Sequence, residues 1–193
     1  EETIRIWEAN NRRILAGQVI NEETKFIINN ELRTYQQIAF PIMNGETAEG
    51  IAGFNIDVTD RVKYFSRVEK LNDCLLAFGN DTQSNVRELL RLCGETLNGA
   101  VVVFNRISIN GEIAVAADWR LPERFIRSGI LEETICSLAV NDVHGKPVEI
   151  NDLQHSIYNK PESNIALFGY QTYLGVVVKI AGKTLGTVCL YYH

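Results

Sequence analysis

The chain has no long apolar run, no cluster of basic residues and no closely spaced pair of cysteines. A membrane-spanning helix needs about 20 consecutive apolar residues, so none is predicted here, and no signal peptide is recognisable. Nucleic-acid binding relies on clustered Lys and Arg, whereas the 24 acidic residues outnumber the 19 basic ones and the net charge is −5. We therefore expect no nucleic-acid partner and no direct membrane contact.

The four cysteines each stand among apolar residues, and their spacing fits no metal-binding knuckle. Free cysteine behaves as a small hydrophobic residue, which predicts buried, reduced thiols at Cys74, Cys93, Cys136 and Cys189. Reduced thiols fit a cytoplasmic location. No metal site is predicted.

A charged helix without Gly or Pro is predicted over residues 57–78, because apolar residues recur there every three or four positions. The segments on both sides of it are typical of sheet. Before it we expect a helix over residues 1–16 and then three antiparallel strands, at 19–29, 32–42 and 50–58. The Asn-Gly pair at 44–45 is a strong hairpin signal between the last two strands.

The second half is predicted to begin with a helix over residues 83–97, which the polar residues 80–82 would cap. Strands or extended segments are predicted at 100–109, 112–119, 148–153, 172–180 and 184–192, with a helix near 131–140 and a loop over 156–169. A long irregular connection in a compact domain is usually functional. We expect it to lie across one face of an antiparallel sheet and to enclose a pocket.

Residues 35–61 resemble the C-terminal half of a PAS domain. The matching segments are Phe40-Pro41-Ile42, an Asn-Gly turn, Ile51-Ala52-Gly53 and the closing Asp57-Val58-Thr59-Asp60-Arg61. The first two strands and the ligand-pocket helices of that family have no counterpart. The resemblance therefore implies an incomplete domain, and the chain is expected to be a fragment of a longer protein.

Residues 134–190 resemble a GAF domain. The matching segments are Ile135-Cys136, Gly145-Lys146-Pro147, Asp152-Leu153, Pro161, Tyr173-Leu174-Gly175 and Leu185-Gly186-Thr187-Val188-Cys189. The earlier strands of that family are similar to Asn105-Arg106-Ile107 and Trp119-Arg120-Leu121-Pro122. The helix that usually ends a GAF domain is expected to be missing.

The predicted architecture is α+β: a three-strand antiparallel PAS remnant at 1–60, a connecting signalling helix at 61–79, and a GAF-like antiparallel sheet with helices at 80–193. The resemblance implies a sensory module of a bacterial-type multidomain protein, of the histidine kinase or diguanylate cyclase class. A small ligand or signal would act in the GAF pocket and be relayed through the helix, whose apolar stripe also predicts a homodimer. The alternative is a dimerisation or interaction scaffold that binds no ligand.

The residues expected at the GAF pocket are mostly aromatic, and the resemblance does not identify their ligand or cofactor: Phe104, Trp119, Phe125, Cys136, Asp152, His155, Tyr158 and Tyr173. The residues expected to relay the signal are Asp57, Thr59, Val62 and Phe65. Asp57 or Thr59 is expected to anchor its corner through hydrogen bonds. No catalytic residue is predicted in this chain.

Three ligand classes known among GAF relatives are disfavoured by particular residues. The acidic pair of cyclic-nucleotide binders is replaced by Thr172-Tyr173, and Cys136 lacks the adjacent His of bilin binders. Haem needs an axial ligand, and His155, the only histidine near the pocket, is expected to have an ordinary surface role. A remote alternative is a Cys-based sulfoxide reductase. That chemistry needs an activated thiolate and a second thiol within reach, and the sequence does not show that Cys136 and Cys189 are close.

Overall fold

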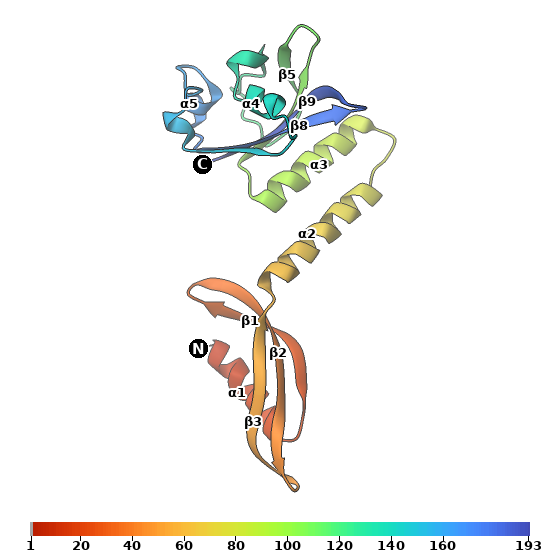
Figure 1. The fold of residues 1–193 in the computed structure, drawn as a ribbon, viewed down its shortest axis with the longest axis vertical. Helices are drawn as coiled ribbons and strands as arrows, with labels where there is room; N and C mark the ends of the chain where they lie inside the picture. Colours follow the sequence, from red (N-terminus) through yellow and green to blue (C-terminus); the bar gives the residue numbers. More distant parts are fainter. Residues whose placement is uncertain (1) are drawn as a thin grey trace. The chain divides into compact units, whose positions relative to one another are not determined.

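The computed structural model describes residues 2–193, so Glu1 of the first predicted helix lies outside the described residues. The chain forms two compact units, one up to Glu69 and one from Lys70 to His193, and the predicted α+β class is confirmed (Figure 1). In chain order the elements are α1 (Glu2–Leu15), β1 (Ile20–Ile28), β2 (Glu31–Asn44), β3 (Thr47–Asp57), α2 (Thr59–Leu76), α3 (Thr82–Leu97), β4 (Val101–Ile107), β5 (Glu112–Trp119), β6 (Ser128–Ile130), η1 (Leu131–Glu133), α4 (Cys136–Asn141), β7 (Val148–Asn151), η2 (Leu153–His155), α5 (Asn164–Phe168), β8 (Thr172–Ile180) and β9 (Lys183–Tyr192).

The first unit is a three-stranded antiparallel sheet in the order β1-β2-β3, with α1 packed on one face. Its small core consists of Ile14, Ile20 and Ala39, with Ile51 beside them. One buried polar contact crosses this layer, because the Asn10 side chain donates a 2.7 Å hydrogen bond to Gln37 Oε1. The predicted meander of three strands is therefore confirmed.

Pro41 lies inside β2 and not at either end of the strand. The pairing explains why it is tolerated. The β1–β2 ladder stops at the Ile20–Ala39 pair, so that beyond Ala39 only β3 is paired with β2. A proline lacks a backbone N–H, and one free side on the strand accommodates that loss.

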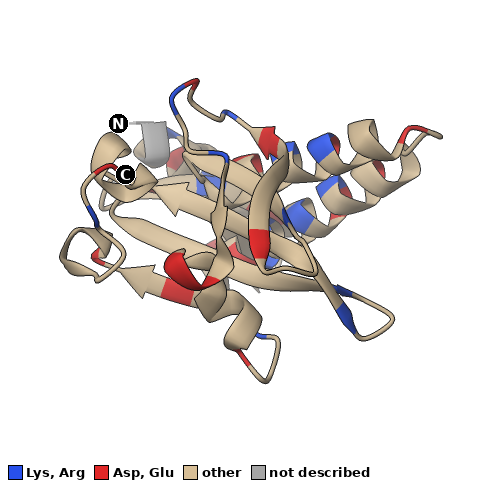
Figure 2. Cartoon of the chain, turned by 90° about the horizontal axis from the view of Figure 1, so that it is seen from above, with Lys and Arg blue, Asp and Glu red and all other residues tan. Residues whose placement is uncertain are grey.

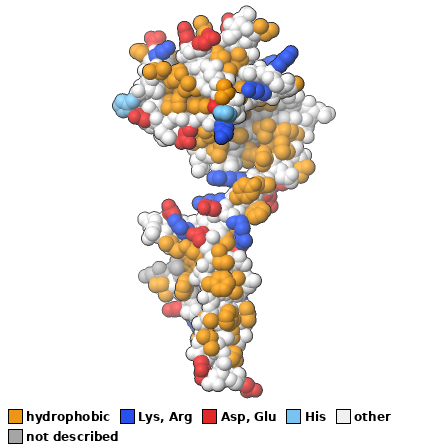
Figure 3. All heavy atoms as spheres, viewed as in Figure 1, with side chains coloured by type: hydrophobic (Ala, Val, Ile, Leu, Met, Phe, Trp, Pro, Cys, Tyr) orange, Lys and Arg blue, Asp and Glu red, His pale blue; other side chains and the backbone are white. Residues whose placement is uncertain are grey.

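The face of this sheet opposite α1 is rich in exposed apolar side chains. Alternation along β2 and β3 places Phe40, Ile42, Phe54 and Ile56 on it, each between 45% and 56% exposed. Hydrophobic side chains along the first unit are visible in Figure 3.

The end of β3 is fixed to β2 by side-chain hydrogen bonds, as predicted for Asp57 or Thr59. Asp57 Oδ1 accepts from the Thr59 N–H at 3.0 Å, and Thr59 Oγ1 accepts from the Thr34 N–H at 2.9 Å. Arg33 adds a 3.2 Å ion pair with Asp57. The hydrogen bonds from Thr59 are the main cause of the lowered pKa of Asp57. This corner sets the point where α2 begins.

The second unit is a six-stranded antiparallel sheet in the order β6-β5-β4-β9-β8-β7. The side chains of β4 alternate between two cores. Val102 packs towards α3, with Leu90, Ala117 and Leu190. Val101 and Val103 belong to the larger core on the other face, which α4 covers from above β8 and β9.

Helix α3 forms where the sequence predicts it because both ends are capped. The Asp81 carboxylate accepts from the backbone N–H groups of Gln83 and Ser84. Asn98 ends the helix in the left-handed conformation, with φ 55°, and its N–H donates to the Gly94 carbonyl. The apolar face between these caps is therefore held against β4 and β5.

The connection between β5 and β8 differs in detail from the prediction. The helix expected near 131–140 is a short 3-10 turn, η1, followed by α4, because the backbone is extended at Thr134 between them. The expected loop over 156–169 contains α5, which Ser163 caps by accepting from the Ala166 N–H. Strand β6 was not predicted, since three exposed residues carry no periodic signal.

Acidic and basic residues both occur along much of the described part of the chain (Figure 2). Within residues 2–193 no helix has the length and apolarity that crossing a membrane requires. The same part of the chain holds no group of three His, Cys, Asp or Glu side chains placed to bind a metal ion.

Candidate functional site

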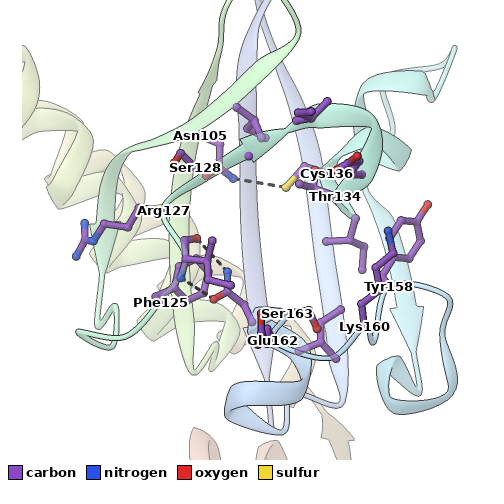
Figure 4. A pocket seen from close by; sticks show the side chains of 18 of the residues that line it. Asn105, Phe125, Arg127, Ser128, Thr134, Cys136, Tyr158, Lys160, Glu162 and Ser163 are labelled. Carbon is purple, nitrogen blue, oxygen red and sulfur yellow. Dashed lines mark hydrogen bonds between the residues drawn. The ribbon is translucent and has the colours of Figure 1, made fainter.

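An open cavity of about 310 Å³ lies in the second unit between the face of the sheet that carries Val103 and the connection from β5 to β8. Its inner wall is mainly apolar, formed by Val103, Ile113, Phe125, Ile135, Ile165 and Tyr191. Its remaining lining is mostly polar and includes Asn105, Arg127, Ser128, Glu133, Thr134, Lys160, Glu162, Ser163 and Asn164. Figure 4 shows labelled members of this lining on β4 (Asn105), on residues 125–136 and on residues 158–163, with Arg127 pointing away from the others. Small-molecule sites typically combine such an apolar wall with a few polar groups.

Two walls of the cavity are joined by one side chain. Asn164, the first residue of α5, accepts from the Ile126 N–H at 2.7 Å and donates to the Ile126 carbonyl at 3.0 Å. The stacked rings of Phe125 and Phe168, 6.1 Å apart, join the same two segments. The irregular connection is therefore ordered around the cavity by specific contacts.

Two thiols meet at the cavity. Cys136, at the start of α4, lines it, and its Sγ lies 3.4 Å from the Sγ of Cys189 on β9. The Tyr173 hydroxyl lies 3.2 Å from Cys189 Sγ. The Asn105 amide donates to Cys136 at 3.6 Å and to Cys189 at 3.7 Å.

The strand register builds this thiol cluster, which we define as Cys136, Cys189, Tyr173, Asn105 and Thr187. Asn105 pairs directly with Thr187 across β4 and β9, and Cys189 follows two residues later on the same face. All five residues are buried. Because the cluster contains no charged side chain, hydrogen bonds and burial together modulate the two thiols.

The cluster separates the acidities of the two cysteines. Hydrogen bonding, first of all with Cys189, lowers the pKa of Cys136 to about 7, although burial acts in the opposite direction. Burial raises the pKa of Cys189 well above its usual value, and the hydrogen bond with Cys136 acts in the same sense. Burial also raises the pKa of Tyr173, which keeps its hydroxyl protonated. Cys136 is therefore the thiol that ionises first.

The family of the chain follows from a comparison with known domains. The family model of the GAF domain matches residues 81–193, more than half of the chain. The chain belongs to the GAF domain family. GAF domains are commonly sensory or regulatory modules of signalling proteins, and the cavity with its thiol cluster lies within the matched residues.

Solved structures share the fold of this GAF domain. The GAF domain of A. aeolicus nlh2 is 13% identical, with a TM-score of 0.54 over 69% of this chain and 81% of that chain. The free methionine-R-sulfoxide reductase of Neisseria meningitidis is 15% identical, with a TM-score of 0.52 over 65% and 72%. A chromophore-binding domain of a Stigmatella aurantiaca bacteriophytochrome is 13% identical, with a TM-score of 0.54 over 100% and 72%. No curated protein matches the chain.

The GAF cavity includes three of the eight residues expected at the pocket: Phe125, Cys136 and Tyr158. Tyr173 lies behind it in the thiol cluster. Phe104 and Trp119 are not on this side of the sheet, because strand alternation directs them to the core shared with α3.

Asp152 and His155 also lie outside the cavity lining. They are exposed and pair with each other, with His155 Nδ1 2.7 Å from Asp152 Oδ1. Both residues belong to the turn of η2, with Asp152 directly before it and His155 at its end. The buried residue of this turn is Leu153. Neither side chain therefore reaches the cavity of the GAF domain.

The most informative residues missed by sequence reasoning are Asn105 and Thr187. Both are polar residues in the central strands of the GAF sheet, and the residues two positions away on the same face of each strand are apolar. A polar side chain flanked by buried strand residues requires a buried partner, and that signal was present in the sequence. Their partner could not be assigned without the register.

Proposed function

We propose that this chain is the sensory part of a signalling protein and that its GAF domain binds a small ligand in the 310 Å³ cavity. The carrying observation is the combination of an apolar inner wall with convergent polar groups. The open side admits a ligand, and the size fits a molecule at the lower end of the usual range, about 300 to 1,000 Å³ for ligand pockets.

Blocking the cavity is expected to abolish ligand retention. Ser128 lines it on β6 and is exposed, so Ser128→Trp would fill space without disturbing the core. We expect native mass spectrometry of the purified wild type to show an added small-molecule mass. The variant should bind that molecule at least about tenfold more weakly, which corresponds to about 1.4 kcal/mol of binding free energy. Thr184→Trp, also exposed and outside the cavity, is the matched control. An unliganded wild type would support the interaction scaffold instead.

The relay is proposed to run through α2, which is a continuous helix from Thr59 to Leu76. A ligand that binds two conformations unequally shifts their populations, and a rigid helix can transmit that shift. The proposed relay residues occupy its start: Asp57 and Thr59 fix the corner, Val62 is half-buried and Phe65 is exposed. The preceding unit is proposed to be the PAS remnant.

The output class is proposed to be a histidine kinase or a diguanylate cyclase. The full protein that contains this chain would be tested for ATP-dependent autophosphorylation and for production of cyclic diguanylate. If the full protein shows neither activity, with or without a bound ligand, this output class is excluded.

A homodimer through α2 is proposed from an exposed apolar stripe on one side of the helix. Phe65, Val68, Leu71 and Leu75 are each at least 45% exposed. We expect light scattering to give a dimer at high micromolar concentration and Val68→Lys to give a monomer, because a buried unpaired ammonium is costly. Ser66→Lys, on the opposite side of the helix, should remain dimeric. A wild type that stays monomeric contradicts this arrangement.

A thiol-dependent sulfoxide reductase is the second candidate. The favouring observation is the 3.4 Å separation of Cys136 Sγ and Cys189 Sγ, which supplies the second thiol that this chemistry needs. One structural relative is named as a free methionine-R-sulfoxide reductase. Formation of methionine from methionine sulfoxide, in the presence of a dithiol reductant, tests this candidate.

A further inference from the structure

The two buried cysteines at the cavity lie 3.4 Å apart, and this arrangement suits a chemistry beyond ligand binding. We propose that Cys136 and Cys189 form a two-electron redox pair, in which a small hydroperoxide that enters the cavity oxidises Cys136 and Cys189 then closes a disulfide. The inference is independent of the proposed ligand and of the relay.

The two thiols have different access to the cavity, and this assigns their roles. Cys136 lines the cavity, whereas Cys189 lies behind it in a central strand and is fully buried. A small oxidant therefore meets Cys136 first. The lowered pKa of Cys136 and the raised pKa of Cys189 agree with this order, since the thiolate is the nucleophile.

The first step is attack by the Cys136 sulfur on one oxygen of the hydroperoxide. The O–O bond breaks, Cys136 becomes a sulfenic acid, and the leaving oxygen takes up the proton lost by the thiol and departs as water or an alcohol. Sulfur loses two electrons and the peroxide gains them. The Asn105 amide, 3.6 Å from the sulfur, is placed to stabilise the thiolate by donating a hydrogen bond.

The second step is attack by Cys189 on the oxidised sulfur. The S–S bond forms, the S–O bond of Cys136 breaks, and the hydroxyl leaves as water with the proton from Cys189. The sulfur atoms must approach from 3.4 Å to about 2.05 Å. Cys189 lies on β9, which is paired with β4 on one side and β8 on the other, so we expect Cys136 to make the movement. Cys136 is the first residue of the six-residue α4 and follows an irregular stretch.

The test is oxidation of the full chain with a stoichiometric amount of hydrogen peroxide. We expect titratable thiols in denaturant to fall from four to two, and peptide mapping to identify a Cys136–Cys189 disulfide that dithiothreitol reverses. The rate should rise about tenfold from pH 6 to pH 8 and then level off, as for a thiol of pKa about 7. A thiol of ordinary pKa would continue to accelerate past pH 8.

Variants separate the two roles. Cys189→Ser should stop at a sulfenic acid on Cys136 that dimedone traps, and Cys136→Ser should form neither product. Cys74→Ser combined with Cys93→Ser, which removes the other two thiols, should leave the disulfide unchanged. Peptide mapping of the disulfide in the wild-type chain needs no variant, so a variant that fails to fold does not block the test.

Methionine sulfoxide is the comparison oxidant. A disulfide formed by the sulfoxide but not by hydrogen peroxide overturns the inference and assigns the pair to the reductase candidate. No disulfide between these two residues with either oxidant also overturns it. Neither outcome affects ligand retention, which is measured separately.

Discussion

Replacing Gly186 with alanine is expected to lower the free energy of unfolding of the GAF domain by about 3 kcal/mol or more. Gly186 lies on β9 opposite Arg106 of β4, in the middle of the sheet. A Cβ placed there would overlap the Asn105 carbonyl, which is backbone and cannot turn away. The two central strands would have to separate, and the Asn105–Thr187 pair of the thiol cluster lies next to the break.

The measurement is urea unfolding followed by the fluorescence of Trp119, in a Trp7→Phe background that removes the other tryptophan. Gly129→Ala is the matched control, because a Cβ on that edge strand would lie in ordinary contact, 3.8 Å from Thr134 Cγ2. The free energy of unfolding of the control should lie within about 1 kcal/mol of the wild-type value. A Gly186→Ala midpoint as close to wild type as that of the control would show that the strands yield at little cost.

Much of the fold was accessible from the sequence because the decisive signals are local. The Asn44-Gly45 turn fixes a hairpin, and the polar residues 80–82 fix the start of α3. At the corner of Asp57 and Thr59 only the hydrogen bond between these two residues is local, whereas the bonds to Thr34 and Arg33 depend on strand pairing. The β5–β8 connection was predicted least well, since its short helices depend on contacts such as Asn164 with Ile126.

The site was less accessible because it depends on register and on the face of each strand. Phe104 and Trp119 are aromatic like Phe125, yet only Phe125 reaches the cavity. The meeting of Cys136 with Cys189, 53 residues apart, requires both the β4–β9 pairing and the position of α4. A single sequence records neither of these.

The second large effect is expected at Gly175, which pairs directly with Cys189. Tyr173 precedes it by two residues on the same face of β8, and its ring leans over the glycine to bring the hydroxyl to Cys189. A Cβ at Gly175 would overlap the outer end of that ring. Tyr173 is fully buried and packs edge-on against Tyr191, 5.5 Å away, so the ring has no free direction in which to move.

We therefore expect Gly175→Ala to destabilise the GAF domain by about 1 to 3 kcal/mol through overpacking. A double-mutant cycle identifies the cause, because Tyr173→Leu removes the overlapping ring atoms. In that background Gly175→Ala should become neutral or stabilising by about 0.5 to 1 kcal/mol, since alanine is favoured over glycine within a strand. Urea unfolding of the four proteins gives the coupling energy. Equal losses in both backgrounds would mean that Gly175 is required by the backbone itself, and that the approach of Tyr173 to the thiol pair does not depend on it.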